Sequence, residues 1–340
     1  MRQFLSIPHL PRAGMCPVNG IRDLVHWRSS RDWSNEFVWG LGQGGGFAYL
    51  KFNSADPPRQ VYTGIATPRQ HRYLAALLNE SLTEIENRTF KFSWRKARGA
   101  VDNGTPPVLG PLDMFHLPFY EGIYHKRHIP IHYVLLIGYD DEKAYIQDTG
   151  KEEVQEISLK DLQMAWDVNV PCLGKRNRLV VIDIPQELPP TDALICKSIA
   201  DTCKTMLHPP VSMIGIPAMK KVGSEIANWP EVLGEVKTAK CLLQVCEYLN
   251  SPPDPEGDHL TAGRNLVIAF LQEAGEATGL DFSEAISQLH ESMATIPILA
   301  EAIRQNDLET AATCFNRVAD AETGAYVELS RIVEGKILLG

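Results

Sequence analysis

Cys16 occupies a position suited to a nucleophile. A loop at residues 9–15 leads to it, Pro17 follows it, and residues 18–27 carry apolar side chains at helical spacing. Proline is favoured at the first position of a helix, so we expect Cys16 to be the N-cap of this helix. The helix dipole and the free backbone N–H groups at that end favour the thiolate form of a cysteine. The alternative interpretation is a small buried apolar residue, which is what most lone cysteines are.

A histidine and an aspartate further along the chain can supply a base and an acid. Residues 131–148 have the pattern of strand, tight turn and strand, with His132 at the start of the first strand and Asp148 at the end of the second. The ends of an antiparallel hairpin are neighbours, so two side chains 16 residues apart can meet there. We therefore predict a triad in which Cys16 is the nucleophile, His132 is the base and Asp148 orients the imidazole.

Each of these partners also has a structural interpretation. A histidine at a strand start can serve packing alone, and Asp148 can cap the turn at residues 149–150. Acids at the predicted hairpin turn and histidines in loop-like sequence are weaker alternatives, because their geometry is less defined. These alternatives are Asp140, Asp141, His116, His125 and His128.

The composition is that of an intracellular globular protein. Its 340 residues suit two domains or one large one, and an apolar content of 44% is ample for a packed core. The N-terminus does not resemble a secretory signal, and no apolar run approaches the roughly 20 residues of a membrane span. Seven cysteines without a CxxC pair favour reduced thiols over disulfides or structural zinc. We therefore expect a cytoplasmic protein that binds neither a membrane nor a metal.

The net charge of −9 is unevenly distributed. Residues 1–187 hold 22 Lys and Arg against 21 Asp and Glu, which leaves them at +1. Residues 188–340 hold 11 against 21, which gives −10. An acidic second half without a basic stripe argues against nucleic-acid binding.

The two halves also differ in pattern. Residues 1–187 mix helical segments with β-rich runs and glycine turns, whereas residues 188–340 have helical spacing almost throughout. A proline-containing segment at 185–192 is typical of a linker. We therefore predict an α+β domain at 1–187 and an all-α domain at 188–340. The helices predicted for the second domain are 192–207, 213–228, 230–250, 260–279, 281–304 and 306–337, with one loop at 251–258.

A glycine-rich tract at residues 40–46 is a further candidate for substrate binding. Gly44 and Gly45 would let the backbone approach a ligand closely, with N–H groups lining an acyl or phosphate pocket. A dinucleotide-binding loop does not fit, because these glycines lead into a strand pattern rather than a helix. The alternative is a tight connection between a helix and a strand. Glu36, just before the tract, is a candidate partner for a substrate amine.

The end of the predicted strand at residues 108–114 gathers a charged residue and several aromatic residues. Asp113 and Tyr120 in this cluster are candidates to line a substrate cleft. The alternative interpretation is aromatic packing against the neighbouring hairpin, which would give both residues a purely structural role.

These motifs together resemble the butirosin biosynthesis protein H family. The resemblance is most specific in the glycine-rich segment and in the segment that begins at His132, and it covers most of the chain. The matching segments are Cys16 with its helix, residues 35–40 with the glycine tract, 112–118, 132–141 with Asp148, 215–229 and 263–275.

The resemblance implies a papain-like cysteine-peptidase-type domain followed by a helical domain. It also implies an acyltransferase of natural-product biosynthesis, which moves an acyl or aminoacyl group from the phosphopantetheine thioester of an acyl carrier protein to an amine. Cys16 would carry the acyl group, His132 would move protons and Asp148 would hold the imidazole. The expected partners are an acyl carrier protein as donor and a small amine as acceptor. Phosphopantetheine enters only as part of the donor, so no cofactor is expected.

Two other functions stay open at this point. The segment from His132 to Asp148 is also similar to peptidase domains that cleave bacteriocin leaders, so a cysteine peptidase or amidase is one alternative. A non-catalytic module that binds a carrier protein or a ligand is the other. The sequence does not identify the second oxyanion-hole donor, the acyl group or the acceptor, and it leaves a homo-oligomer open.

Overall fold

The computed structural model describes residues 2–249 and 262–339 of the chain, which divides into two compact units. The first unit consists of Met1–Val38 and Ala66–Pro189, and the second of Trp39–Ile65 and Pro190–Gly340. The loop predicted at 251–258 lies outside the described residues.

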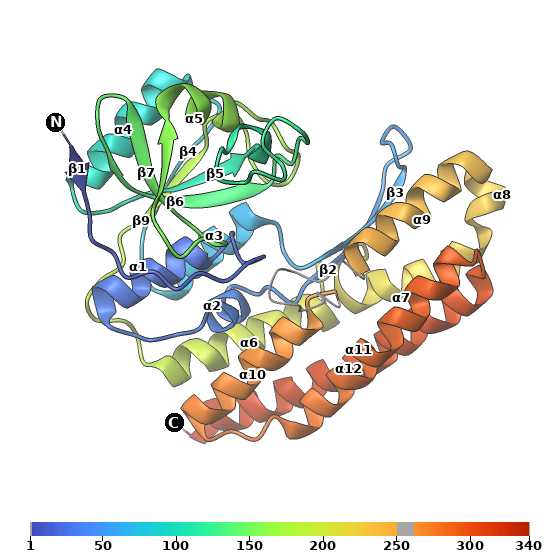
Figure 1. Ribbon diagram of the computed structural model, residues 1–340. Helices are drawn as coiled ribbons and strands as arrows, with labels where there is room; N and C mark the ends of the chain where they lie inside the picture. Colours follow the sequence, from blue (N-terminus) through green and yellow to red (C-terminus); the bar gives the residue numbers. More distant parts are fainter. Residues whose placement is uncertain (1, 250–261, 340) are drawn as a thin grey trace. The chain divides into compact units, whose positions relative to one another are not determined.

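The first unit is built on a seven-stranded antiparallel sheet, seen in Figure 1. Six strands follow the order β4-β9-β5-β6-β7-β8, and β1 pairs with the far end of β6. In this order the long hairpin of β6 and β7 lies inside the sheet, so both of its strands are held on two sides. The strands are β1 (Gln3–Phe4), β4 (Leu82–Ile85), β5 (Val108–Leu112), β6 (His132–Tyr139), β7 (Lys143–Asp148), β8 (Gln155–Ser158) and β9 (Leu179–Ile182).

Helices cover both faces of this sheet (Figure 1). On one face, Trp94 of α4 and Trp166 of α5 belong to a buried apolar cluster with residues of the central strands. On the other face, Gly20 of α1 lets the helix approach the sheet so closely that an added Cβ would lie 3.1 Å from Leu135 Cβ. The helices are α1 (Asn19–Ser29), α2 (Asn35–Leu41), α3 (Thr67–Leu77), α4 (Phe90–Asp102) and α5 (Leu159–Trp166), and Met114–His116 form a short 3-10 turn.

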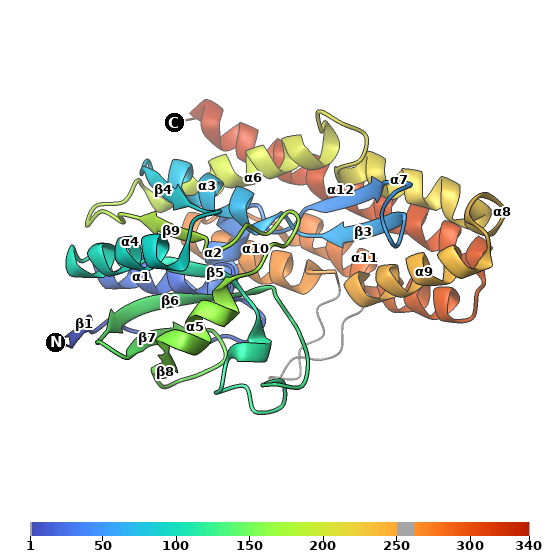
Figure 2. The same cartoon turned by 90° about the horizontal axis from the view of Figure 1, so that it is seen from above.

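The second unit consists mainly of helices. The longest, α11 and α12, pack against each other and run side by side in Figure 2, and α12 also packs on α6 and α7. The helices are α6 (Thr191–Leu207), α7 (Gly215–Glu225), α8 (Trp229–Leu233), α9 (Glu235–Leu249), α10 (Arg264–Thr278), α11 (Ser283–Arg304) and α12 (Leu308–Leu339). The α+β class predicted for the first domain and the helical class predicted for residues 188–340 are confirmed.

One predicted helix is divided in the structure. The sequence pattern suggested a single helix at 230–250, whereas α8 ends at Leu233 and α9 begins at Glu235. Gly234 between them has φ 78° and ψ 161°, which no α-helix can continue through. The apolar periodicity is preserved on both sides of the glycine, so the pattern alone could not reveal the break.

The division into units also differs from the prediction in one segment. The observed boundary at 189/190 is close to the predicted one at 187/188, but Trp39–Ile65 belong to the second unit. This segment contains the hairpin of β2 (Phe47–Lys51) and β3 (Arg59–Thr63), which packs on α7 and α9. Its strand pattern made it look like part of an α+β domain, and only the helices that it packs on place it elsewhere.

Within the described chain, every helix is too short or too polar to span a bilayer.

The close approach of α2 to α10 generates a prediction about stability. A Cβ added at Gly40 would lie 2.1 Å from Phe270 Cγ, so Gly40→Ala must displace that ring. We expect this overpacking to lower the free energy of unfolding by about 1–3 kcal/mol. Urea denaturation followed by circular dichroism measures the effect.

Gly99→Ala in α4 is the matched control, because nothing lies within 4 Å of its added Cβ. Removing a helical glycine there should raise stability by about 0.5–1 kcal/mol. Equal stability of the two variants would show that α2 has room to adjust.

Candidate active site

The register of the β6–β7 hairpin brings a histidine and an aspartate together. Val134 of β6 pairs with Asp148 of β7, and His132 lies two residues before Val134, on the same face of the strand. The hydrogen bond between His132 Nε2 and Asp148 Oδ2 measures 2.6 Å. Their side chains are 6% and 0% exposed. The predicted meeting of these two side chains is therefore what the structure shows.

The carboxylate of Asp148 receives two further hydrogen bonds. The hydroxyl of Tyr120 donates to Oδ1 at 2.5 Å, and the backbone N–H of Gly150 donates to the same oxygen at 3.0 Å. Burial alone would raise the pKa of Asp148, but His132 and these donors outweigh it and hold that pKa below its ordinary value. Asp148 is therefore a buried anion, and both of its carboxylate oxygens accept hydrogen bonds.

The remaining nitrogen of His132 is the one available to Cys16. Because Nε2 is bound to Asp148, Nδ1 is the nitrogen left to exchange a proton with a thiol, and Cys16 is close enough to influence the pKa of His132. Burial alone would lower the pKa of His132, but Asp148 and then Cys16 raise it to about 10. The arrangement favours a protonated imidazole beside the sulfur.

Cys16 itself lies in a turn before α1, which corrects the prediction that it is the N-cap. The N-cap is Val18, because the helix begins at Asn19. The backbone N–H groups of Val18 and Asn19 both donate to Met15 O, at 3.0 and 2.9 Å, and this turn closes over the cysteine. Pro17 is the third residue of this turn, and a proline directly after a cysteine gives the same sequence signal there as at the first position of a helix. Cys16 is partly exposed, as a nucleophile must be.

His71 is a residue near Cys16 that sequence analysis missed. Its Nε2 is 2.7 Å from the backbone carbonyl oxygen of Pro17, and its ring is fully buried. Burial and then Arg178 lower the pKa of His71 to about 3, so the imidazole is neutral and donates to Pro17 from Nε2. The sequence around His71 does not indicate this contact, because His71 and Pro17 are 54 residues apart in the chain.

The weaker candidates for the acid and the base lie elsewhere. Asp140 caps the hairpin turn, where its Oδ1 accepts from the N–H groups of Glu142 and Lys143 at 2.8 and 2.7 Å. Three histidines surround the ring of Phe115, which belongs to the same segment between β5 and β6 as they do. They are His116, His125 and His128, with ring centroids 4.9, 5.2 and 4.1 Å from that of Phe115.

Two predicted substrate contacts are engaged with the protein itself. Glu36 Oε1 pairs with Arg12 Nε at 2.7 Å, and both side chains are about one-fifth exposed. Asp113 Oδ1 accepts from two backbone N–H groups of its own loop, and its Oδ2 is 2.6 Å from His128 Nδ1. Tyr120, predicted to bind substrate, contacts Asp148 and lies edge-on to the ring of His132.

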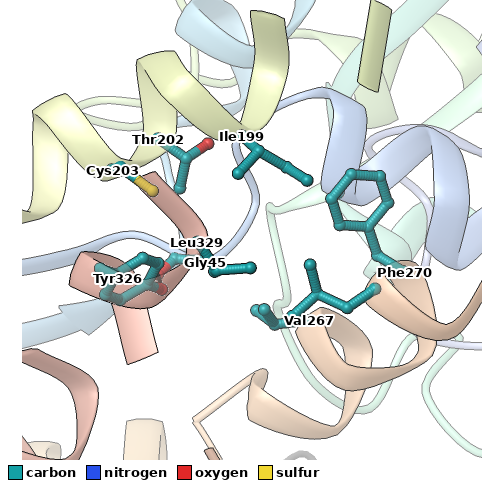
Figure 3. Close-up of a pocket in the computed structure, with 10 residues that line it drawn as sticks. Gly45, Ile199, Thr202, Cys203, Val267, Phe270, Tyr326 and Leu329 are labelled. Carbon is teal, nitrogen blue, oxygen red and sulfur yellow. Dashed lines mark hydrogen bonds between the residues drawn. The ribbon is translucent and has the colours of Figure 1, made fainter. Parts of the chain in front are cut away.

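Gly44 and Gly45 belong to the second unit, where the tract packs tightly. A Cβ at Gly44 would lie 2.1 Å from the ring of Trp39, which fits the alternative of a tight helix-to-strand connection. Gly45 lines a pocket among the helices, shown in Figure 3. The hydroxyls of Thr202 and Tyr326 in that pocket already donate to backbone carbonyls, so it presents mainly apolar surface.

A metal centre has no candidate among residues 2–249 and 262–339, because no three His, Cys, Asp or Glu side chains are suitably grouped there.

Two family models match successive parts of the chain. The model of butirosin biosynthesis protein H, N-terminal, matches residues 15–149, and that of a domain of unknown function (DUF4872) matches residues 160–329. No curated protein matches the chain. Among solved structures, the chain is similar to one from Bacillus anthracis described as a C39-like peptidase, at 15% identity, over 54% of this chain and 98% of that one. The TM-score is 0.36, so the fold class rests on the observed sheet and helices.

The geometry predicts that Asp148→Asn costs far more activity than Asp140→Asn. Asparagine keeps the shape of Asp148 but can hold the wrong imidazole tautomer, so we expect a loss on the order of 10³–10⁴-fold in kcat. Asp140→Asn should leave kcat within about twofold, because the hydrogen bonds of that side chain go to the hairpin turn and to Tyr145. Steady-state kinetics of both variants measures the difference, and the reverse ranking would move the acid to the turn.

The ion pair also predicts how stability depends on pH. The pKa of His132 is raised to about 10 in the folded chain. Its contribution to the free energy of unfolding should therefore be complete below pH about 6.5 and decline until it is lost above pH about 10.

Urea denaturation between pH 6 and 10.5 measures this decline. Asp148→Asn should flatten it, since the partner that raises the pKa is gone, whereas Asp140→Asn should keep the wild-type slope. If the stability of Asp148→Asn declines with pH as steeply as that of the wild type, groups other than His132 cause the decline.

Proposed function

Because the chain belongs to the butirosin biosynthesis protein H-like family, we propose that it is a papain-like cysteine acyltransferase of natural-product biosynthesis. It would transfer an acyl or aminoacyl group from an acyl-carrier-protein thioester to an amine. The observation that carries this proposal is the buried His132–Asp148 pair beside Cys16. An imidazolium next to a cysteine sulfur stabilises the thiolate, which is the form that attacks a thioester.

The first half of the reaction loads the enzyme. The sulfur of Cys16 forms a bond to the thioester carbonyl carbon, and the bond from that carbon to the phosphopantetheine sulfur breaks. His132 gives its Nδ1 proton to the departing thiolate, so free phosphopantetheine thiol and acyl-Cys16 result. Bound to Asp148 through Nε2, the ring keeps Nδ1 directed at the reacting sulfur during this transfer.

The second half releases the product. The amine attacks the carbonyl carbon of acyl-Cys16, its proton passes to His132 Nδ1, and the carbon–sulfur bond to Cys16 breaks to give an amide. A thioester is a sufficiently activated donor, so neither ATP nor a metal is needed. The backbone N–H of Cys16 is the proposed first donor to the oxyanion. Exclusion of water from the acyl-enzyme then decides whether the product is an amide or a free acid.

A thioester assay tests this function directly. Purified protein is incubated with an acyl-carrier thioester, with and without an amine, and the products are identified by mass spectrometry. We expect an amide only when amine is present. Free acid as the sole product would make the protein a hydrolase, and the absence of turnover would make it a binding module.

Cys16→Ala should abolish turnover and the acyl-enzyme adduct, because no other group then carries the acyl chain. Cys172→Ala is the matched control, since Cys172 is an exposed thiol of the same unit, and it should keep full activity. An active Cys16→Ala variant would eliminate the proposed nucleophile. Unchanged thermal melting of both variants shows that the fold is intact.

We further propose that the acidic carrier protein docks on Lys126 and Arg127. Both side chains are exposed in the loop between β5 and β6, which also carries Tyr120. Lys126 Nζ donates to Glu121 O at 2.9 Å, so its ammonium is held at the surface of this loop. Charges at the rim of an interface set the association rate and its dependence on salt.

Reversing both charges to glutamate should lower kcat/KM for the carrier-bound donor by about tenfold at low salt. A small pantetheine thioester should react as before, because it needs no docking. Reversal of Lys91 and Arg95 is the control: these exposed residues of α4 give the same change in net charge. An equal effect on both donors, or an equal effect of both double variants, would contradict docking at this loop.

A further inference from the structure

A second histidine–aspartate pair lies beside the triad in the first unit. His9 Nδ1 is 2.5 Å from Asp23 Oδ2, and the two side chains are 7% and 0% exposed. The other ring nitrogen, Nε2, is 3.1 Å from the backbone oxygen of Asp148 and 3.0 Å from that of Lys151. His9 therefore contacts both α1, through Asp23, and the turn that follows the acid of the triad.

The partners of His9 define its protonation. Carbonyl oxygens only accept hydrogen bonds, so Nε2 must carry a proton to bond Asp148 and Lys151. The carboxylate of Asp23 likewise accepts from Nδ1, which makes the ring a doubly protonated cation. Burial alone would lower the pKa of His9, but the hydrogen bond and the charge of Asp23, followed by the two carbonyls, raise it above its ordinary value.

The same region holds the N-terminal segment to the end of β7 at two more points. Gln147 Nε2 donates to Ile7 O at 2.6 Å, and Thr149 Oγ1 donates to Arg12 O at 2.5 Å. His9 lies between these two contacts, so residues 7–12 are hydrogen-bonded along the segment that carries Asp148. Residues 7–12 lead directly to Cys16, so these contacts help to fix the position of Cys16 relative to Asp148.

We propose that His9 is a positioning residue, which as a buried cation clamps the loop leading to Cys16 onto the turn after Asp148. It touches neither sulfur nor substrate and acts through the backbone that presents both ends of the triad. The proposal rests on the proposed function only in taking Cys16 as the nucleophile. His9 lies before residues 15–149, the range of the family match.

Loss of a proton would loosen the clamp. A neutral ring has one nitrogen without a proton. The lone pair of that nitrogen would face either the carboxylate of Asp23 or the two carbonyl oxygens, and either contact is repulsive. The charged groups at His9 are Asp23 and, on the same carboxylate, Arg22 of α1, whose Nη1 is 3.4 Å from Asp23 Oδ1. Asp148 and Lys151 meet the ring through their backbone oxygens. The clamp is therefore complete at low pH and is lost as pH rises through the raised pKa of His9.

The first test measures alkylation of Cys16 by iodoacetamide in His9→Gln, with Cys172 as the internal reference. We expect an about tenfold lower rate at Cys16, since small displacements of a reacting group cost this much or more. The transfer reaction should lose kcat with little change in KM. His26→Gln is the matched control, because His26 is a partly exposed histidine of α1 whose ring lies 3.3 Å from Arg31 O and 3.6 Å from the exposed carboxylate of Asp32.

The second test uses Asp23→Asn, which keeps the shape and removes the charge. A neutral His9 can then donate from Nε2 to the carbonyls and accept at Nδ1 from the asparagine amide, so the clamp no longer needs a cation. The alkylation rate of Cys16 relative to wild type should therefore rise as pH increases through the raised pKa of His9 in the wild type. Asp23→Asn also tests the clamp if His9→Gln does not fold.

Wild-type alkylation in His9→Gln, or a pH-independent ratio in Asp23→Asn, would overturn the clamp. Alkylation requires no acyl donor, so these outcomes are separate from the outcome of the thioester assay. A protein that fails to transfer acyl groups but loses Cys16 reactivity in His9→Gln would still have the clamp.

Discussion

The first unit depends on one buried carboxylate. Asp148 is fully buried, and an ionised carboxylate without partners would cost several kcal/mol there. Its donors are His132, Tyr120 and the N–H of Gly150, and they come from the start of β6, the loop after β5 and the turn after β7. These segments must therefore be placed together for the carboxylate to be satisfied. The same hydrogen bonds that orient the imidazole also specify the local fold.

Two oppositely charged pairs divide the task of holding the site. The pair of His132 and Asp148 raises the pKa of the ring beside Cys16, and the pair of His9 and Asp23 fastens the chain segment that leads to that cysteine. In both pairs the carboxylate raises the pKa of the histidine against the opposing effect of burial. Removing either carboxylate changes the protonation of a ring rather than simply deleting a contact.

The second unit also contains a buried ion pair, which joins its helices. Arg264 of α10 makes two hydrogen bonds to Glu322 of α12, at 2.7 and 2.8 Å, and Ser292 of α11 donates to the same carboxylate at 2.8 Å. A buried pair of this kind adds little net stability, but a shifted helix would leave a charge unpaired, so the pair defines the register of the three helices. In the glycine tract, the lack of a side chain lets Gly40 pack closely against the ring of Phe270 and Gly44 against the ring of Trp39.

The sequence by itself determined the features that depend on neighbours along the chain. A continuous apolar run, a turn and a second strand-like run predicted the β6–β7 hairpin, and with it the meeting of His132 and Asp148, because register in a hairpin follows from local geometry. Helical spacing likewise predicted the helices of the second unit, apart from the break at Gly234.

Tertiary structure alone decided which distant segments meet. The placement of residues 39–65 in the helical unit, the contact of Tyr120 with Asp148 and the clamp around His9 join segments that no periodicity relates. Such partners are chosen by the need to satisfy buried polar groups, and that need arises only once the chain is folded.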